Sequence, residues 1–249
     1  MIELKNLQKS FGDLSILKGV DAVFETGKVN MIIGASGSGK TVTIKCMVGL
    51  IEPSAGDVLY DGRSVLELGL RDKKKLRQEI GMLFQSAALF DSMTVEENVA
   101  FPLRMFTKQP ESEVLDRVNF CLKRVGLENR NKLMPSEISG GMQKRVGIAR
   151  AISMDIKYLF CDEPNSGLDP KTALKIDHLI EEITDEFNIT TVVNTHDMNS
   201  VFEVGDKVVF LYNGKKLWEG TPDDILNTEV EELKDLIFAS RFIRRAYGV

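Results

Sequence analysis

The stretch that decides the fold is Gly34-Ala35-Ser36-Gly37-Ser38-Gly39-Lys40-Thr41, which matches the pattern G-x-x-x-x-G-K-[ST] of a phosphate-binding loop. The apolar run 29–33 before it predicts a buried strand, and residues 41–49 after it predict a helix closed by a glycine. Glycines let backbone N–H groups turn inward around an anion, and the helix N-terminus adds a partial positive charge. Lys40 supplies a charge for the terminal phosphates, and the Thr41 hydroxyl suits Mg²⁺. A flexible Gly/Ser loop is the alternative, but the flanking strand and helix favour nucleotide binding.

The composition bounds the remaining classes. The 249 residues, 43% hydrophobic and 28% charged, can form one large domain or two small ones. A net charge of −5 creates no field that attracts nucleic acid, so we expect no nucleic-acid partner. No apolar run approaches the roughly 20 residues that span a bilayer. Three widely spaced cysteines (Cys46, Cys121 and Cys161) fit reduced core thiols of a cytoplasmic protein.

Strand and helix patterns alternate along the chain. Apolar runs at 80–84, 158–161 and 190–194 predict buried strands separated by helices, which is typical of a mostly parallel sheet covered on both faces. Asp61-Gly62 and Asn213-Gly214 lie between strand-like runs and predict hairpins with type I′ turns. From about 94 to 153 the pattern is helical.

The last segment predicts two capped helices. Thr221 and Pro222 begin the first, and Thr228 caps the second. The second helix carries more apolar residues than one narrow stripe needs, so it packs either on its own domain or on a partner chain, and the sequence favours neither. These residues are Val230, Leu233, Leu236, Ile237, Phe238, Phe242 and Ile243.

Two acids follow the predicted strand 158–161. Asp162 ends that strand, at the edge where open α/β sheets bind ligands, and its carboxylate can hold Mg²⁺ or its water. Glu163 is adjacent and would face a water that attacks the terminal phosphate. A pair of surface acids is the alternative, which the phosphate-binding loop makes the weaker interpretation.

Ser139, Gly140 and Gly141 open another predicted helix with free N–H groups, which makes a second anion site. An ordinary serine N-cap followed by glycines is the alternative. One nucleotide loop together with a second anion-binding helix start suggests that one of them serves a neighbour's nucleotide.

Over residues 1–220 these motifs, in this order, resemble the ATP-binding-cassette (ABC) ATPases, the motor subunits of ABC transporters. The matching segments are 34–41 (Walker A), Gln85 (Q-loop), 138–142 (signature), 158–163 (Walker B with the catalytic glutamate), 166–169 (D-loop), His196 (switch histidine) and Phe11 (an aromatic stacked on adenine). Val42 and Asn165 depart from residues common in the family, and neither departure removes a catalytic group.

The resemblance implies an α/β P-loop NTPase fold: a mostly parallel central sheet, an antiparallel β subdomain and an inserted α-helical subdomain at about 86–153. It places an ABC ATPase domain at 1–220, and residues 221–249 would then form a C-terminal helical extension. The implied cofactors are ATP and Mg²⁺. The implied partners are a second copy of the chain and an integral membrane permease, at the cytoplasmic face of the inner membrane.

The resemblance also implies roles for single residues. Phe11 and the loop Gly34, Ala35, Ser36, Gly37, Ser38, Gly39, Lys40 and Thr41 would bind ATP, and Ser139, Gly140 and Gly141 would bind it in trans. Thr41, Gln85 and Asp162 would hold Mg²⁺. Glu163 would polarise the attacking water, His196 and Lys40 would hold the γ-phosphate, and Gln85 would link Mg²⁺ to the membrane subunit.

The segments 84–103, 139–145 and 195–200 are similar to those of Mla/Mce-type transporters, which move phospholipids between bacterial membranes. This likeness implies a lipid cargo and an Mce-type lipid-binding partner. One alternative is the ATPase of an importer for a small polar solute. The other is a soluble ATP-driven switch in DNA repair or translation, which the single cassette and the acidic balance disfavour.

Overall fold

A computed structural model of the chain describes residues 1–238, so the apolar tail residues Phe242 and Ile243 lie outside the described part. The strands are β1 (Ile2–Phe11), β2 (Leu14–Phe24), β3 (Lys28–Ile33), β4 (Ala55–Tyr60), β5 (Arg63–Ser64), β6 (Ile80–Leu83), β7 (Tyr158–Asp162), β8 (Thr190–Asn194), β9 (Lys207–Tyr212) and β10 (Lys215–Gly220). The helices are α1 (Lys40–Met47), α2 (Leu70–Gln78), α3 (Val95–Phe106), α4 (Glu111–Arg124), the short 3₁₀ helix η1 (Pro135–Glu137), α5 (Gly140–Ala151), α6 (Pro170–Phe187), α7 (Met198–Val204), α8 (Pro222–Ile225) and α9 (Glu231–Ile237).

The central sheet is mostly parallel, as predicted. Its strand order is β10-β9-β3-β8-β7-β6, and in the described chain β10 alone runs antiparallel, beside β9. Parallel strands end at one common edge, and ligands of open α/β sheets bind there. The segments that follow β3, β6, β7 and β8 therefore meet at this edge, and they are the segments that hold the predicted site residues.

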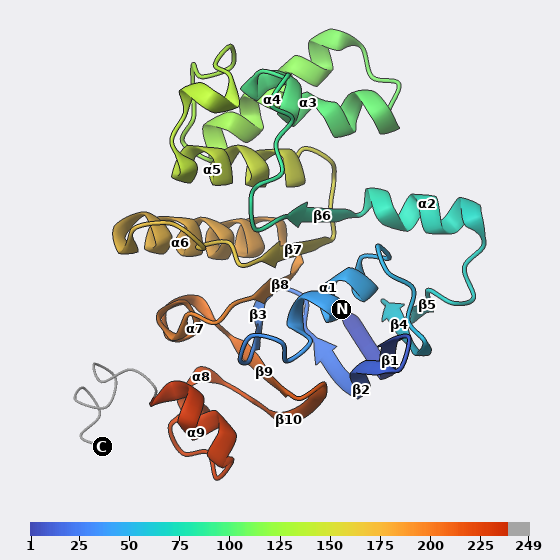
Figure 1. Cartoon of the computed structure of the whole chain (residues 1–249). Helices are drawn as coiled ribbons and strands as arrows, with labels where there is room; N and C mark the ends of the chain where they lie inside the picture. Colours follow the sequence, from blue (N-terminus) through green and yellow to red (C-terminus); the bar gives the residue numbers. More distant parts are fainter. Residues whose placement is uncertain (239–249) are drawn as a thin grey trace.

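Helices and a second sheet cover both faces of the central sheet (Figure 1). Along β3, Met31 and Ile33 belong to a core shared with the helices α3 to α7, whereas Ile32 belongs to a core shared with α1 and the second sheet. Phe160 and Cys161 divide between the two cores in the same way. Because successive side chains of a strand point to opposite faces, an uninterrupted apolar run is what a doubly covered strand requires.

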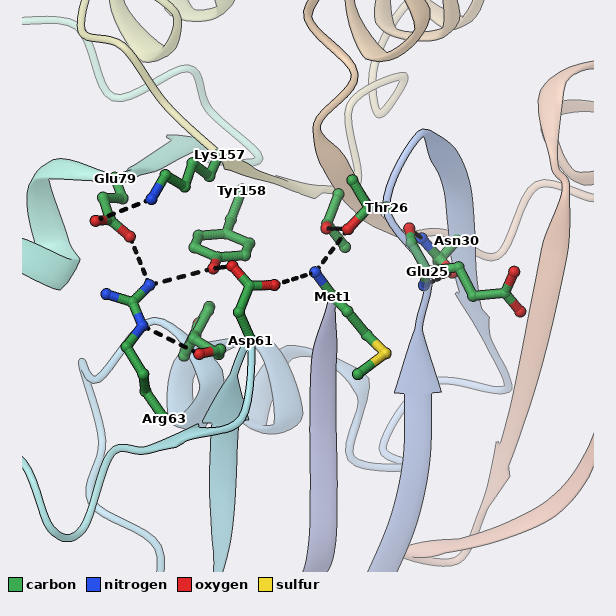
Figure 2. A network of polar contacts seen from close by, with 11 residues as sticks. Met1, Glu25, Thr26, Asn30, Asp61, Arg63, Glu79, Lys157 and Tyr158 are labelled. Atoms are coloured by element: carbon green, nitrogen blue, oxygen red, sulfur yellow. Dashed lines mark hydrogen bonds and ion pairs between the residues drawn. The ribbon is translucent and has the colours of Figure 1, made fainter.

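The second sheet is antiparallel, with the order β2-β1-β4-β5. A polar network fastens it to the central sheet at the start of β7 (Figure 2). The Tyr158 hydroxyl donates to Asp61 in the β4–β5 turn, and Arg63 pairs with Glu79 at 2.7 Å. The turn at Asp61 and Gly62 has φ angles of 48° and 77°, which confirms the predicted type I′ hairpin.

The helices α3, α4 and α5 form a group at one end of the molecule, next to β6 (Figure 1). Thr94 and Glu97 form a capping box at the start of α3, with Thr94 Oγ1 accepting from the Glu97 N–H at 3.2 Å. The group is inserted between β6 and β7, so it carries α5 to the central sheet beside β6.

The described part of the tail packs on the same chain. Leu233 and Ile237 of α9 are buried in the core that α3 to α7 share with the central sheet. The predicted cap at Thr228 is wrong: its hydroxyl accepts from the Val230 N–H at 3.2 Å, and this turn delays the helix to Glu231. The division at residue 220 stays a prediction. Within residues 1–238 no helix has the length and apolarity needed to cross a membrane.

Candidate functional site

The loop 34–41 connects the end of β3 to the start of α1. Gly34 and Gly39 have φ angles of 150° and 105°. A Cβ added at Gly34 would lie 2.2 Å from the carbonyl oxygen of Leu211, and one at Gly39 would lie 2.7 Å from Leu17 Cδ2. Both positions therefore need glycine, because neighbouring strands press directly on the loop backbone.

Lys40 closes the loop on itself. Its Nζ donates to the carbonyl oxygens of Gly34 at 2.7 Å and Ala35 at 3.2 Å. The side chain is buried, and burial lowers the pKa of its ammonium. A buried ammonium whose hydrogen bonds in the described chain go to two neutral carbonyl groups can bind an anion such as a phosphate.

Three polar side chains meet behind the loop. Thr41 Oγ1 donates to Asp162 Oδ1 at 3.3 Å, and Asn194 Nδ2 donates to the same Asp162 oxygen at 2.5 Å. Asp162 and Asn194 face each other in register at the ends of β7 and β8. The sequence reasoning missed Asn194, although a polar residue that ends a buried strand is a signal for this edge of the sheet.

Glu163 and His196 form a direct pair. His196 Nδ1 lies 2.7 Å from Glu163 Oε2. The Glu163 side chain is 15% exposed and that of His196 is 67% exposed, so the pair lies at the surface end of the site. Glu163 has a φ of 50°, a left-handed conformation that is uncommon for a non-glycine residue.

Gln85 and Phe11 flank the site. Gln85 follows β6, and its Nε2 donates to Ser166 Oγ at 3.2 Å. Phe11 ends β1 and is 48% exposed, with the Lys9 ammonium 4.9 Å from its ring centroid. It pairs with Leu14 on β2, the strand whose Leu17 contacts the phosphate-binding loop.

Ser139, Gly140 and Gly141 lie at the start of α5. Ser139 Oγ accepts from the Met142 N–H at 3.3 Å, as an N-cap does. A Cβ added at Gly141 would lie 2.6 Å from Thr172 Cγ2 on α6. Within residues 1–238 none of the three makes a hydrogen bond to the loop 34–41. The chain therefore brings the residues from β3, β6, β7 and β8 together but leaves the signature segment apart from them.

Lys144 is a second residue that the sequence reasoning missed. Its Nζ donates to the backbone carbonyl oxygens of Gln85 and, at 3.3 Å, of Glu163. A lysine inside a helix is usually a solvated residue, and no sequence signal distinguishes this one.

The residues present fit a nucleotide and its metal ion. Among residues 1–238, Ser38 Oγ and Asn194 Oδ1 are buried and find no hydrogen-bond partner, which a bound ligand or water would supply. Thr41, Asp162 and Gln85 contribute only oxygen ligands, the kind that Mg²⁺ prefers. The fit therefore rests on both the backbone of the loop and the side chains behind it.

Comparison with known proteins agrees with this geometry. Residues 17–166 match the ABC transporter family. The chain is 40% identical over 230 residues to the probable ribonucleotide transport ATP-binding protein mkl of Mycobacterium leprae, covering 92% of this chain and 66% of that protein. It therefore spans slightly less than two thirds of that relative's length.

Two further relatives bear different transport names. The intermembrane phospholipid transport system ATP-binding protein MlaF of Haemophilus influenzae is 38% identical, over 92% of this chain and 87% of that protein. The methionine import ATP-binding protein MetN of Carboxydothermus hydrogenoformans is 41% identical, over 90% and 67%. The resemblance to ABC ATPases is thus confirmed, with MlaF among the relatives.

Solved structures confirm the fold. The ATP-binding cassette MJ0796, as a dimer in a post-hydrolysis state with ADP and phosphate, superposes with a TM-score of 0.81 at 33% identity, over 89% of this chain and 99% of that one. The structure of cbiO1 from Clostridium perfringens, part of the ABC transporter complex cbiONQ, superposes with a TM-score of 0.85 at 30% identity, over 100% of this chain and 98% of that one. The chain therefore belongs to the ABC transporter family and carries the ATPase cassette of that family.

Proposed function

We propose that two copies of this chain bind two ATP molecules between them and that Mg²⁺-dependent hydrolysis drives a membrane permease that moves phospholipid. The observation that carries the proposal is the separation between the phosphate-binding loop and the start of α5. The loop 34–41 has Asp162, Glu163 and His196 beside it, whereas Ser139 to Gly141 make no hydrogen bond to it within residues 1–238. A second chain is the simplest source of the missing half, and the cassette MJ0796 was solved as a dimer.

In this proposal the loop binds the phosphates with its backbone N–H groups and the Lys40 ammonium. Thr41, Asp162 and Gln85 would hold Mg²⁺, which would neutralise charge on the terminal phosphates. Glu163 orients and polarises the attacking water. Phosphoryl transfer depends on positioning and charge neutralisation more than on covalent chemistry, so a site built of backbone donors and a few fixed side chains suffices.

The Glu163–His196 pair can act as a unit in this mechanism. The 2.7 Å contact engages His196 Nδ1 and Glu163 Oε2, which leaves His196 Nε2 for the γ-phosphate and Glu163 Oε1 for the attacking water. The pair can therefore stay formed while both residues act.

An apolar groove supports the permease partner. It has a volume of about 860 Å³ and lies between β6 and the helices α1, α2, α3 and α5. Its lining includes Phe84, Phe90, Phe101, Met105 and Phe106. Met105 is 58% exposed and Phe90 is 42% exposed. Large apolar side chains left at a surface groove are typical of a protein-binding site. Gln85 directly follows Phe84, so a permease segment in the groove would lie next to a proposed Mg²⁺ ligand.

The lipid cargo rests on the resemblance of residues 84–103, 139–145 and 195–200 to Mla/Mce-type ATPases, and on MlaF as a relative. The name of MetN supports a second candidate, import of a small polar solute. Purifying the complex from native membranes separates the two. An Mce-type partner with bound phospholipid supports lipid transport, and a periplasmic solute receptor supports import. Either complex would lie at the cytoplasmic face of the inner membrane.

The ATPase proposal is tested with Glu163→Gln. We expect turnover to fall on the order of a hundredfold or more, because the group that polarises the water is lost. ATP binding should persist, and a dimer should accumulate in ATP but not in ADP. Steady-state hydrolysis, nucleotide titration and light scattering measure the three quantities. The control is Glu231→Gln, an exposed acid on α9 that pairs with Lys234. Unchanged turnover of Glu163→Gln would refute the assignment.

A further inference from the structure

Lys144 is a buried cation at the junction of three segments of the proposed site. It is the fifth residue of α5 and is 4% exposed. Burial lowers the pKa of its ammonium, so keeping the charge there is costly unless fixed partners compensate. The partners are the backbone carbonyl groups of Gln85 and Glu163.

Both carbonyl groups belong to residues where the chain leaves the central sheet. β6 ends at Leu83 and β7 at Asp162, and the two strands are neighbours. Beyond these ends the Glu163 carbonyl accepts from the Ser166 N–H at 3.2 Å, and Lys144 adds a donor to it and to the Gln85 carbonyl. Because one ammonium holds both carbonyl groups, it restrains the peptide groups at Gln85 and Glu163 relative to each other. The left-handed φ of Glu163 makes such a restraint important, since this conformation persists only where surrounding contacts impose it.

The same lysine is attached to the signature segment. Ser139 lies five positions before Lys144, and an α-helix rises about 1.5 Å per residue, so roughly 7.5 Å of rigid helix joins the two. A shift or rotation of α5 when Ser139 to Gly141 meet a partner's nucleotide would therefore move the ammonium with it.

We propose that Lys144 is a positioning residue that couples the start of α5 to the backbone of Gln85 and Glu163, and thereby aligns them for hydrolysis. The proposal rests on the function proposed above. It separates the residue from those that bind nucleotide: Lys144 makes no hydrogen bond to the loop 34–41 within the described chain, so we expect it to act on the chemical step through two other residues. Its effect should appear in kcat and not in nucleotide affinity.

The purified complex with its permease is the appropriate sample, and three variants test the proposal. Lys144→Met keeps the aliphatic stem and removes the donors and the charge. Lys144→Gln restores a neutral donor on a shorter side chain. The control is Arg117→Met, because Arg117 Nε and Nη2 donate to the carbonyl oxygens of Ser153 at 2.9 Å and Ile152 at 3.0 Å, at the opposite end of α5. It thus removes a similar contact from the same helix, far from Gln85 and Glu163.

We expect Lys144→Met to lower kcat on the order of tenfold to a hundredfold, the cost of misplacing catalytic groups by about an ångström. KM and the affinity for ATP should change by less than about twofold. In the Glu163→Gln background the ATP-dependent dimer should still form. Lys144→Gln should recover part of kcat, because it can still donate a hydrogen bond. Arg117→Met should lower the melting temperature at least as much and leave kcat unchanged.

Several outcomes overturn the proposal. One is an unchanged kcat in Lys144→Met. Another is a loss of ATP affinity that parallels the loss of kcat, which would make Lys144 a binding residue. An equal loss of kcat in Arg117→Met would indicate a merely structural role. If Lys144→Gln is as slow as Lys144→Met, hydrogen bonding is excluded as the cause. Failure of the unmodified complex to hydrolyse ATP is a separate result, which would remove the proposed function first.

Discussion

The chain contains two helix starts suited to an anion, and they differ in what surrounds them. The start of α1 is enclosed: Ser38, Gly39 and Lys40 are buried, and the Lys40 ammonium is bonded back to the loop. The start of α5 is open, with Ser139 and Gly140 exposed and Ser139 serving as an ordinary cap. The difference is that the start of α1 is enclosed by its own chain, whereas the start of α5 leaves two of its first residues exposed to whatever binds there.

The largest expected effect removes the enclosed site. Lys40→Ala deletes a charge-assisted contact to phosphate, so we expect the affinity for ATP to fall on the order of a hundredfold. Titration with a fluorescent ATP analogue measures it. The control is Lys45→Ala, on the same helix but beyond the loop. Normal ATP binding by Lys40→Ala would contradict the role of the loop and remove the basis of the comparison.

A smaller effect is expected at the open site. Gly141→Ala should leave ATP binding to the single chain intact and lower turnover about tenfold to a hundredfold, because a methyl group would disturb the backbone donors offered to a partner. The added Cβ also meets Thr172 Cγ2 at 2.6 Å. The companion Gly141→Ala/Thr172→Ser removes that clash and keeps the hydroxyl. We expect it to recover melting temperature but not turnover. Full recovery of turnover would mean that Gly141 is needed for local packing alone.

Much of the fold was predictable because single residues carry strong local constraints. Asn213 and Gly214 have φ angles of 47° and 81°, as their type I′ turn requires, and Asp61-Gly62 behaves in the same way. The uninterrupted apolar runs indicated a sheet covered on both faces. The prediction of a helix cap at Thr228 was wrong because a threonine hydroxyl can either cap a helix or close a turn two residues later. The burial of Leu233 and Ile237 selects the turn.

The candidate site was predictable only in part. The loop 34–41 and Asp162 follow from the strands that precede them. Asn194 and Lys144 did not follow, because their importance depends on which strands are neighbours and on which carbonyl groups the Lys144 ammonium reaches. Sequence spacing contains neither fact. The role of Ser139 to Gly141 depends on a second chain, so it stays a prediction.

The smallest expected effect concerns α6, the helix that contacts segments of both sites. Asp177 of α6 is 2% exposed, and burial raises the pKa of its carboxyl to about 6, although Asn165 Nδ2 donates to it at 2.7 Å. Asn165 belongs to the segment after Glu163, and α6 also carries Thr172, the neighbour of Gly141. Because the folded state holds this proton more tightly than the unfolded chain, the carboxyl costs stability as the pH rises from about 4 to 6.

Asp177→Asn should remove this penalty. We expect the variant to gain about 1–2 kcal/mol over the unmodified chain in free energy of unfolding between pH 5 and pH 8, from a raised pKa of this size. Urea denaturation at both pH values measures it, with Asp185→Asn, an exposed acid on the same helix, as the control. A pH-independent difference would show that the buried carboxyl is not the titrating group. It would also mean that the titration of Asp177 has no bearing on the difference between the starts of α1 and α5.

The position of the phosphate-binding loop also has a consequence for how the chain is made. The N–H of Gly214 donates to the Ser38 carbonyl oxygen at 3.2 Å, Leu211 presses on Gly34, and β3 lies between β8 and β9. The ribosome synthesises these supporting segments about 150 residues or more after the loop. We therefore expect the loop to reach its nucleotide-binding form only after these segments have been made. Nascent chains that stop short of residue 214 should be unable to retain ATP, and during that interval β3 lacks its neighbours β8 and β9.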